Sequence, residues 1–122
     1  MPKILVIEDE ELMRKTFEFR LKKDGYEVVA ASDGRMGIEL IESTKVDLII
    51  TDITLPFISG LEIVSRVKSN PATQHLPVLI LSGVGLEKAV LKAFELGADD
   101  FITKPFNLSE LSIRVKRHIK TA

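Results

Sequence analysis

Hydrophobic and polar positions divide this chain into two kinds of segment. Short runs of β-branched and other apolar residues, such as Ile4 to Ile7 and Leu48 to Ile50, are typical of buried strands. The stretches between them repeat their apolar residues every three or four positions, which is typical of amphipathic helices. The pattern predicts strands at about 3–8, 27–31, 47–52, 77–82 and 99–103, and helices at about 10–24, 34–43, 59–68, 86–96 and 107–120.

Strands that alternate with helices indicate the α/β fold class, with a parallel sheet that is covered by helices on both faces. The chain has 122 residues, which suits one domain, and we expect residues 1–122 to form it. Gly25 and Gly97 follow predicted helices and favour the left-handed conformation that ends a helix. Asn107 and Glu110 have the spacing of a capping box at the start of the last helix.

Polar residues stand at the ends of four of the predicted strands. In an open parallel sheet, ligands bind at the carboxyl ends of the strands, so these residues are candidates for a functional site. They are Glu8-Asp9-Glu10-Glu11 after the first strand, Asp52 at the end of the third, Ser82-Gly83 at the end of the fourth and Thr103-Lys104-Pro105 at the end of the fifth. One edge of the sheet is therefore expected to collect carboxylates, a hydroxyl and an ammonium group.

The residue types in this set indicate phosphoryl-transfer chemistry. Carboxylates that gather at one site repel each other, and a bound cation relieves the repulsion. Oxygen ligands without a nearby His or Cys favour Mg²⁺ over zinc or copper. Asp52 is the candidate nucleophile, because a carboxylate can attack phosphorus and become an acyl phosphate. Lys104 is the candidate for neutralising charge on the transferred group.

These motifs resemble the receiver domains of bacterial two-component response regulators, including the single-domain chemotaxis type. The resemblance covers the whole chain. It rests on Glu8-Asp9, on Asp52-Ile53-Thr54-Leu55-Pro56 with Gly60, on Ser82-Gly83 and on Lys104-Pro105-Phe106, in that order. It implies a flavodoxin-like, doubly wound sheet of five parallel strands in the order 2-1-3-4-5, with five helices on its two faces.

The resemblance also implies a signalling switch that is activated by phosphorylation. Asp52 would accept a phosphoryl group from a histidine kinase or a histidine phosphotransfer protein, as in a phosphorelay. Mg²⁺ would be bound by Asp9, Asp52 and the backbone carbonyl of Thr54, and Glu8 would act on the metal through water. We therefore expect Mg²⁺ to be the only cofactor.

By the same resemblance, Ser82 and Lys104 would contact the phosphoryl group, and Phe101 would change its exposure together with Ser82. The peptide bond between Lys104 and Pro105 is expected to be cis, which directs Lys104 towards the site. The signal would pass to an output protein or domain through the surface formed by residues 86–120. A dimer that forms on phosphorylation is a further expectation.

Composition narrows the range of partners and locations. A net charge of −1 argues against direct nucleic-acid binding. The longest apolar runs are only as long as strands, so no membrane span is expected, and the absence of a secretory signal favours a cytoplasmic location. The basic residues near the C-terminus are interpreted as a solvent-exposed face favoured by the helix dipole, with partner docking as the alternative; they are Arg114, Lys116, Arg117, His118 and Lys120.

Three other functions compete with the switch. A small Mg²⁺-dependent phosphohydrolase would also form an aspartyl phosphate, but enzymes of the haloacid-dehalogenase type carry a second Asp where this chain has Thr54. A flavodoxin-like module would bind a flavin phosphate, which the acidic segment Glu8 to Glu11 would repel. A receiver-like module could also signal by contact alone, without phosphorylation. We expect no enzyme activity beyond the domain's own phosphorylation and dephosphorylation.

Overall fold

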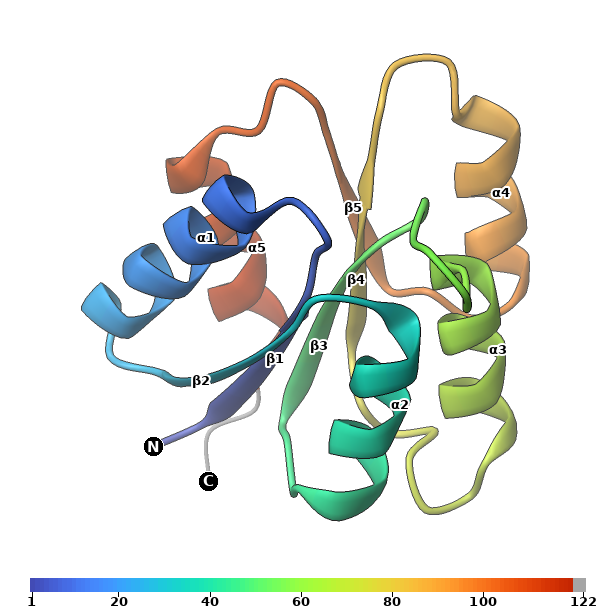
Figure 1. Ribbon diagram of the computed structural model, residues 1–122, viewed down its shortest axis with the longest axis horizontal. Helices are drawn as coiled ribbons and strands as arrows, with labels where there is room; N and C mark the ends of the chain where they lie inside the picture. The colour runs from blue at the N-terminus through green and yellow to red at the C-terminus, as the bar shows by residue number, and fades with distance from the viewer. Residues whose placement is uncertain (120–122) are drawn as a thin grey trace.

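The computed structural model describes residues 1–119, and these residues form a sheet of five parallel strands (Figure 1). The strands are β1 (Lys3–Ile7), β2 (Glu27–Ala31), β3 (Leu48–Asp52), β4 (Val78–Ser82) and β5 (Asp100–Thr103). They lie in the order β2-β1-β3-β4-β5, and each neighbouring pair is parallel. The predicted fold class and strand order are therefore confirmed.

Helices cover both faces of the sheet, as parallel strands require for their crossover connections. One face carries α1 (Glu11–Lys23) and α5 (Leu108–His118), and the other carries α2 (Gly34–Ser43), α3 (Gly60–Ser69) and α4 (Glu87–Glu95) (Figure 1). The three interior strands, β1, β3 and β4, are thus covered by helices on both faces.

Two hydrophobic layers result from this arrangement, because successive strand residues point to opposite faces. Ile4 and Val6 of β1 pack towards α1 and α5, where Phe17 is fully buried. Leu5 and Ile7 pack in the opposite layer, under α2, α3 and α4. Each fully buried side chain of this kind stabilises the fold by roughly 1.5–3 kcal/mol, so the central strands are held from both sides.

The helix ends follow the expected local chemistry with two differences. Gly25 and Gly97 have φ values of 100° and 113°, as a left-handed helix stop requires. The Asn107 side chain accepts a hydrogen bond from the Glu110 N–H at 3.0 Å, but the Glu110 carboxylate lies 3.8 Å from Arg114, so only half of the capping box forms. The last helix ends at His118, before the predicted limit of 120, and Lys120 lies outside the described residues.

All strands run in one direction, so their carboxyl ends share the upper edge of the sheet in Figure 1. The chain reverses its winding direction between β1 and β3, and such a switch point leaves a crevice beyond the strand ends. The residues that follow β1, β3, β4 and β5 meet at this edge. Within residues 1–119, the helices are too short or too polar to cross a membrane.

Candidate functional site

Three carboxylates meet at the carboxyl ends of β1 and β3. Ile7 of β1 pairs with Thr51 of β3, so the next residues along each strand, Glu8 and Asp52, come into register. Glu8, Asp9 and Asp52 each place one carboxylate oxygen within 4.8 Å of the others. Glu8 is only 3 % exposed, Asp52 is partly buried and Asp9 is exposed, so the cluster opens to solvent on the Asp9 side.

Backbone groups hold these carboxylates in place. The Thr54 N–H donates to Oδ1 of Asp52 at 3.3 Å, and the Glu10 N–H donates to Oε2 of Glu8 at 3.4 Å. Nη1 of Arg14 donates to the backbone oxygen of Glu8 at 2.9 Å and so ties α1 to the end of β1. Sequence reasoning missed Arg14, because nothing in the motif around Glu8 shows which later residue turns back to it.

Burial makes the two inner carboxyl groups hard to ionise. Burial, followed by the hydrogen bond and the negative charge of Asp52, raises the pKa of Glu8 from 4.5 to about 8. Burial also raises the pKa of Asp52, although its hydrogen bonds to Glu8 and Thr54 and the charge of Lys104 act in the opposite direction. Without a cation, the pair therefore retains a proton on Glu8 near neutral pH.

The donor set fits a hard divalent cation such as Mg²⁺. The cluster offers carboxylate oxygens only, with no His or Cys among its ligands, and Mg²⁺ prefers such oxygens together with water. Burial, and for Glu8 the neighbouring Asp52, raise the pKa values of these carboxyl groups, so both groups are costly to ionise without a nearby cation. A bound cation would supply the compensating charge, and Glu8, Asp9 and Asp52 are the described residues placed to hold it.

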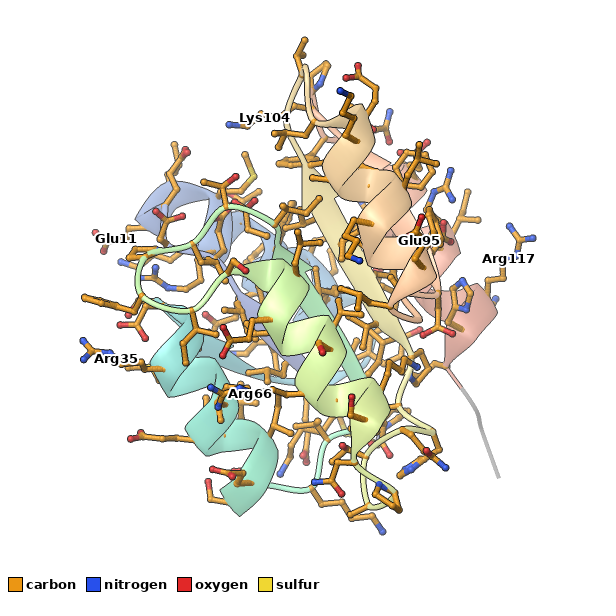
Figure 2. All side chains as sticks on the ribbon, turned by 90° about the vertical axis from the view of Figure 1, so that its right-hand side faces the viewer. Glu11, Arg35, Arg66, Glu95, Lys104 and Arg117 are labelled. Atoms are coloured by element: carbon orange, nitrogen blue, oxygen red, sulfur yellow. The ribbon has the colours of Figure 1, made fainter. Side chains whose placement is uncertain are left out.

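Ser82, Thr103 and Lys104 approach the same edge from β4 and β5. Ser82 is 2 % exposed, and its hydroxyl lies 3.4 Å from the Thr103 hydroxyl, a contact that sequence reasoning did not anticipate. The Lys104 N–H donates to the backbone oxygen of Ser82 at 2.9 Å, and the peptide bond between Lys104 and Pro105 is cis, as the resemblance implies. The Lys104 side chain is exposed at this end of the molecule (Figure 2).

Phe101 lies on β5 beside a cavity that reaches Ser82. Its ring is half-buried and packs edge-on against Phe94 of α4, with 5.8 Å between the ring centroids. The cavity is about 430 Å³, and its apolar wall includes Val90 and Leu91. A larger cavity, about 580 Å³, lies between α2 and α3 and contains none of the predicted site residues.

The interpretation of the C-terminal basic residues as a solvent-exposed face is only partly right. Arg114 and His118 do not form a purely solvated face, because both bond to Asp100, which is only 8 % exposed. Asp100 also accepts the Phe101 N–H at 2.9 Å. Lys116 and Arg117 are exposed as expected. The Asp100 interaction was not predicted, because it depends on how α5 packs against β5 and not on local spacing.

The β3–α3 connection, residues 53–59, begins directly after Asp52 and requires Gly60 at its end. A Cβ on Gly60 would lie 2.8 Å from Cα of Ile53, so a larger residue would push the loop away from the strand. The Gly60 N–H donates to the Ile53 carbonyl at 2.9 Å and closes the connection. Gly60 therefore contributes to the site through backbone approach and not through a side chain.

Comparisons with known proteins show the family of this chain. A family model described as the response regulator receiver domain matches residues 4–116. A response regulator receiver domain protein from Clostridium thermocellum is 34 % identical, with a TM-score of 0.91 over 98 % of this chain and 94 % of that one. A response regulator from Chloroflexus aurantiacus is 36 % identical, with a TM-score of 0.90 over 96 % and 97 % of the two chains.

The likeness extends to a chemotaxis protein. The chemotaxis response regulator CheY4 of Vibrio cholerae is 30 % identical, with a TM-score of 0.89 over 98 % of this chain and 99 % of that one. The family match spans most of the chain, and the solved relatives share the five-stranded parallel fold and its strand order. This chain belongs to the response regulator receiver domains of two-component signalling.

Proposed function

We propose that this chain is a switch in which Asp52 accepts a phosphoryl group in an Mg²⁺-dependent reaction. The observation that supports the proposal most strongly is the cluster of Glu8, Asp9 and Asp52 at the carboxyl ends of two adjacent strands. Asp52 is the last residue of a buried strand, so its carboxylate is held on a rigid element, as a nucleophile requires. Asp9 and Asp52 then supply the charge that binds the cation, and Glu8 acts on it through water.

In the proposed reaction, a carboxylate oxygen of Asp52 forms a bond to phosphorus. The phosphorus–nitrogen bond of a donor phosphohistidine breaks, and its electron pair leaves with the histidine nitrogen. Mg²⁺, when bound, neutralises charge on the phosphoryl oxygens. Asp9, Asp52 and the carbonyl of Thr54 would hold this cation, and Glu8 would act on it through water.

Lys104 and Ser82 would contact the phosphoryl group once it is attached. The backbone hydrogen bond between Lys104 and Ser82 supports this pairing, because it fixes the backbones of the two residues side by side at the ends of adjacent strands. Lys104 would neutralise one phosphoryl oxygen, and the Ser82 hydroxyl would donate to another. The hydroxyl would exchange its contact with Thr103 for the new acceptor.

The switch itself would be a shift between two populations of one fold. Phosphorylation adds an acceptor for Ser82 that is present only in the modified form, and it thereby favours a conformation in which the β4–α4 connection moves towards Asp52. The cavity beside Phe101 supports this, because it gives that ring space to change its exposure. The altered surface would lie within residues 86–119, and Lys120 lies outside the described residues.

Receiver domains interact with histidine kinases or phosphotransfer proteins and with output domains, and the partners of this chain are proposed to belong to these classes. We also propose that the chain catalyses only its own phosphorylation and dephosphorylation, that it works in the cytoplasm and that phosphorylation promotes a dimer.

The test is to measure intact mass after incubation with acetyl phosphate, with and without Mg²⁺. The native chain is expected to gain one phosphoryl group only with Mg²⁺, and Asp52→Asn is expected to gain none. Asp47→Asn is the matched control, because Asp47 precedes the same strand and its carboxylate accepts, within residues 1–119, only the Lys3 N–H, at 2.8 Å. The control should be labelled like the native chain.

The outcomes test the assignment of the acceptor residue and the proposed switch separately. Label that persists in Asp52→Asn would contradict the assignment of Asp52. Absence of label in the native chain, together with Mg²⁺ binding, would indicate that a protein donor is required, and a phosphorylated histidine phosphotransfer protein would then replace acetyl phosphate. Absence of both label and Mg²⁺ binding would favour the module that signals by contact alone.

A further inference from the structure

The connection that carries Thr54 contains a strained residue. Phe57 has a φ of 70°, and it is the only described non-glycine residue with a positive φ. The Ile58 N–H donates to the Pro56 carbonyl at 2.9 Å across Phe57. A hydrogen bond of this kind around a residue with φ near +75° characterises the rare, strained form of the γ-turn. The chain must therefore be held in this conformation by its surroundings.

Two contacts with α2 hold the loop. The guanidinium carbon of Arg35 lies 3.7 Å from the centre of the Phe57 ring, within the range of a cation–π interaction. Next to it, Gly34 allows a close backbone approach, because a Cβ there would lie 2.7 Å from Cβ of Ile58. Figure 2 shows Arg35 on α2 below the loop that leads into α3. Both contacts lie at the start of α2 and reach the same turn.

Neither burial nor backbone preference accounts for the position of the Phe57 ring. Its residue is 70 % exposed, so the ring gains little from burial, and a turn with positive φ favours glycine or asparagine. The ring's described aromatic interaction is with Arg35. The Thr54 N–H, on the same loop, donates to Asp52 at 3.3 Å, so the position of the loop and that of the carboxylate are linked.

We propose that Arg35 and Phe57 form a latch that positions the β3–α3 loop, and with it the Thr54 carbonyl, for the divalent cation. This inference rests on the proposed function, because it assigns a role towards Mg²⁺. Arg35 and Phe57 are positioning residues, and neither contacts the cation. Loss of the latch allows the strained turn to relax and draws the carbonyl away from the cluster.

The sign of the Arg35 effect separates the latch from simple electrostatics. Removal of a positive charge near a carboxylate cluster would strengthen cation binding if charge alone acted. The latch predicts the opposite, because loss of Arg35 releases the loop. An exposed cation–π contact corresponds to roughly a two- to fivefold change in an equilibrium constant, so Mg²⁺ binding is expected to weaken by about that factor.

The experiment measures Mg²⁺ affinity by calorimetry for the full chain and for four variants. Phe57→Leu removes the aromatic face at a similar size and with the same backbone strain, whereas Phe57→Tyr keeps the face. Arg35→Gln removes the cation, and the double variant combines Phe57→Leu with it. Phe57→Leu and Arg35→Gln should each weaken binding about two- to fivefold, the double variant should be no worse than either, and Phe57→Tyr should match the native chain.

A second readout needs no metal. Amide exchange of Ile58 reports the hydrogen bond across Phe57, and it should accelerate in Phe57→Leu and in Arg35→Gln but not in Phe57→Tyr. Arg66→Gln is the charge-matched control, because Arg66 is exposed on α3 and pairs with Glu62 at 2.6 Å. It should alter neither the Mg²⁺ affinity nor the exchange of Ile58.

Several results would overturn the latch. Equal affinities for Phe57→Leu and Phe57→Tyr, additive effects in the double variant, or tighter binding in Arg35→Gln would each do so. The proposed function is tested separately by the native chain. If the native chain binds Mg²⁺ and the variants bind equally well, only the latch fails, whereas failure of the native chain to bind Mg²⁺ removes the cation site and the latch with it.

Discussion

Two sites in this fold place carboxylates in opposite surroundings. Asp100, at the start of β5, bonds to Arg114 and lies 3.0 Å from Nε2 of His118. Glu8 and Asp52, at the ends of β1 and β3, lie with Asp9 in a group of three carboxylates whose oxygens are within 4.8 Å of one another. The carboxylate of Asp100 is compensated by basic groups of the fold itself, whereas the carboxylates at the ends of β1 and β3 are left with an excess of negative charge.

The difference separates a structural role from a functional one. A buried charge whose partners come from the same chain is fixed when the chain folds and ties one element to another, here α5 to β5. A buried charge without such partners reduces stability until something from solution compensates it. The carboxylates at the ends of β1 and β3 are therefore the ones suited to bind a cation and to react.

Among the substitutions compared at a fixed pH, the largest loss of stability is expected from Asp100→Asn, which removes the charge that compensates Arg114. Nε of Arg114 is already buried without a hydrogen-bond partner, so loss of the carboxylate leaves the guanidinium more poorly satisfied. Breaking such a pair should lower the free energy of unfolding by about 3 kcal/mol. Urea denaturation at pH 7 measures it. Glu95→Gln, at an exposed site on α4, is the control and should cause no measurable change.

An effect of opposite sign is expected from Asp52→Asn in the metal-free protein. The substitution removes a carboxylate whose pKa is raised chiefly by burial, so the free energy of unfolding at pH 8 should increase. Urea denaturation in the presence of a chelator measures it. A clear loss of stability would mean that Asp52 is compensated like Asp100, and the contrast between the two clusters would be wrong.

The pH dependence of stability should reveal the excess charge directly. The pKa of Glu8 is about 8 in the folded chain and 4.5 in the unfolded one, so the folded state binds more protons between these values. The contribution of Glu8 to the stability of the metal-free protein is therefore most favourable below about pH 4.5. It falls as pH rises towards 8, by at most about 1.4 kcal/mol per pH unit.

Glu8→Gln provides the matched comparison for this pH profile. In the variant, the free energy of unfolding should decrease less between pH 4.5 and pH 8. The reason is that a glutamine at this position has no proton to release on unfolding. Chemical denaturation at successive pH values measures the two profiles. A native profile that rises over this window, or a variant with an unchanged slope, would contradict the assigned pKa.

The smallest change in stability is expected from Lys104→Ala. Lys104 is exposed and its charge ranks last among the influences on the pKa of Asp52, so urea denaturation should barely change and Mg²⁺ binding should be retained. Phosphorylation by acetyl phosphate should nevertheless slow down, because the phosphoryl group loses its ammonium partner. Lys88→Ala, exposed on α4, serves as the control. Equal rates for both variants would remove Lys104 from the mechanism.

Local sequence patterns could predict much of the fold and of the carboxylate site. The strands and the glycine stops follow from nearest neighbours along the chain, so their positions agree within a few residues. Asp9 and Asp52 could be placed together because parallel strands end at one edge. The roles of Ser82 and Lys104 came from family resemblance, and those roles stay predictions.

Contacts that depend on tertiary packing could not be predicted in this way. Asp100 and Arg114 are joined by how a helix lies on a strand, and no spacing rule encodes that choice. Phe57 in a left-handed turn goes against its own backbone preference, so local rules predict something else there. The partner that offsets this cost, Arg35, comes from another helix and becomes visible only in the folded chain.

The location of the chemistry at strand ends has a consequence for how such a domain can diversify. Exposed apolar side chains on the outer faces of the helices, such as Leu12, Phe19 and Ile113, contribute no group to the carboxylate cluster. Substitutions on those faces could therefore change partner preference while the proposed acceptor and the proposed metal ligands stay unchanged. The same fold can act in different pathways, because the residues proposed to react and the surfaces that could bind a partner lie in separate parts of the molecule.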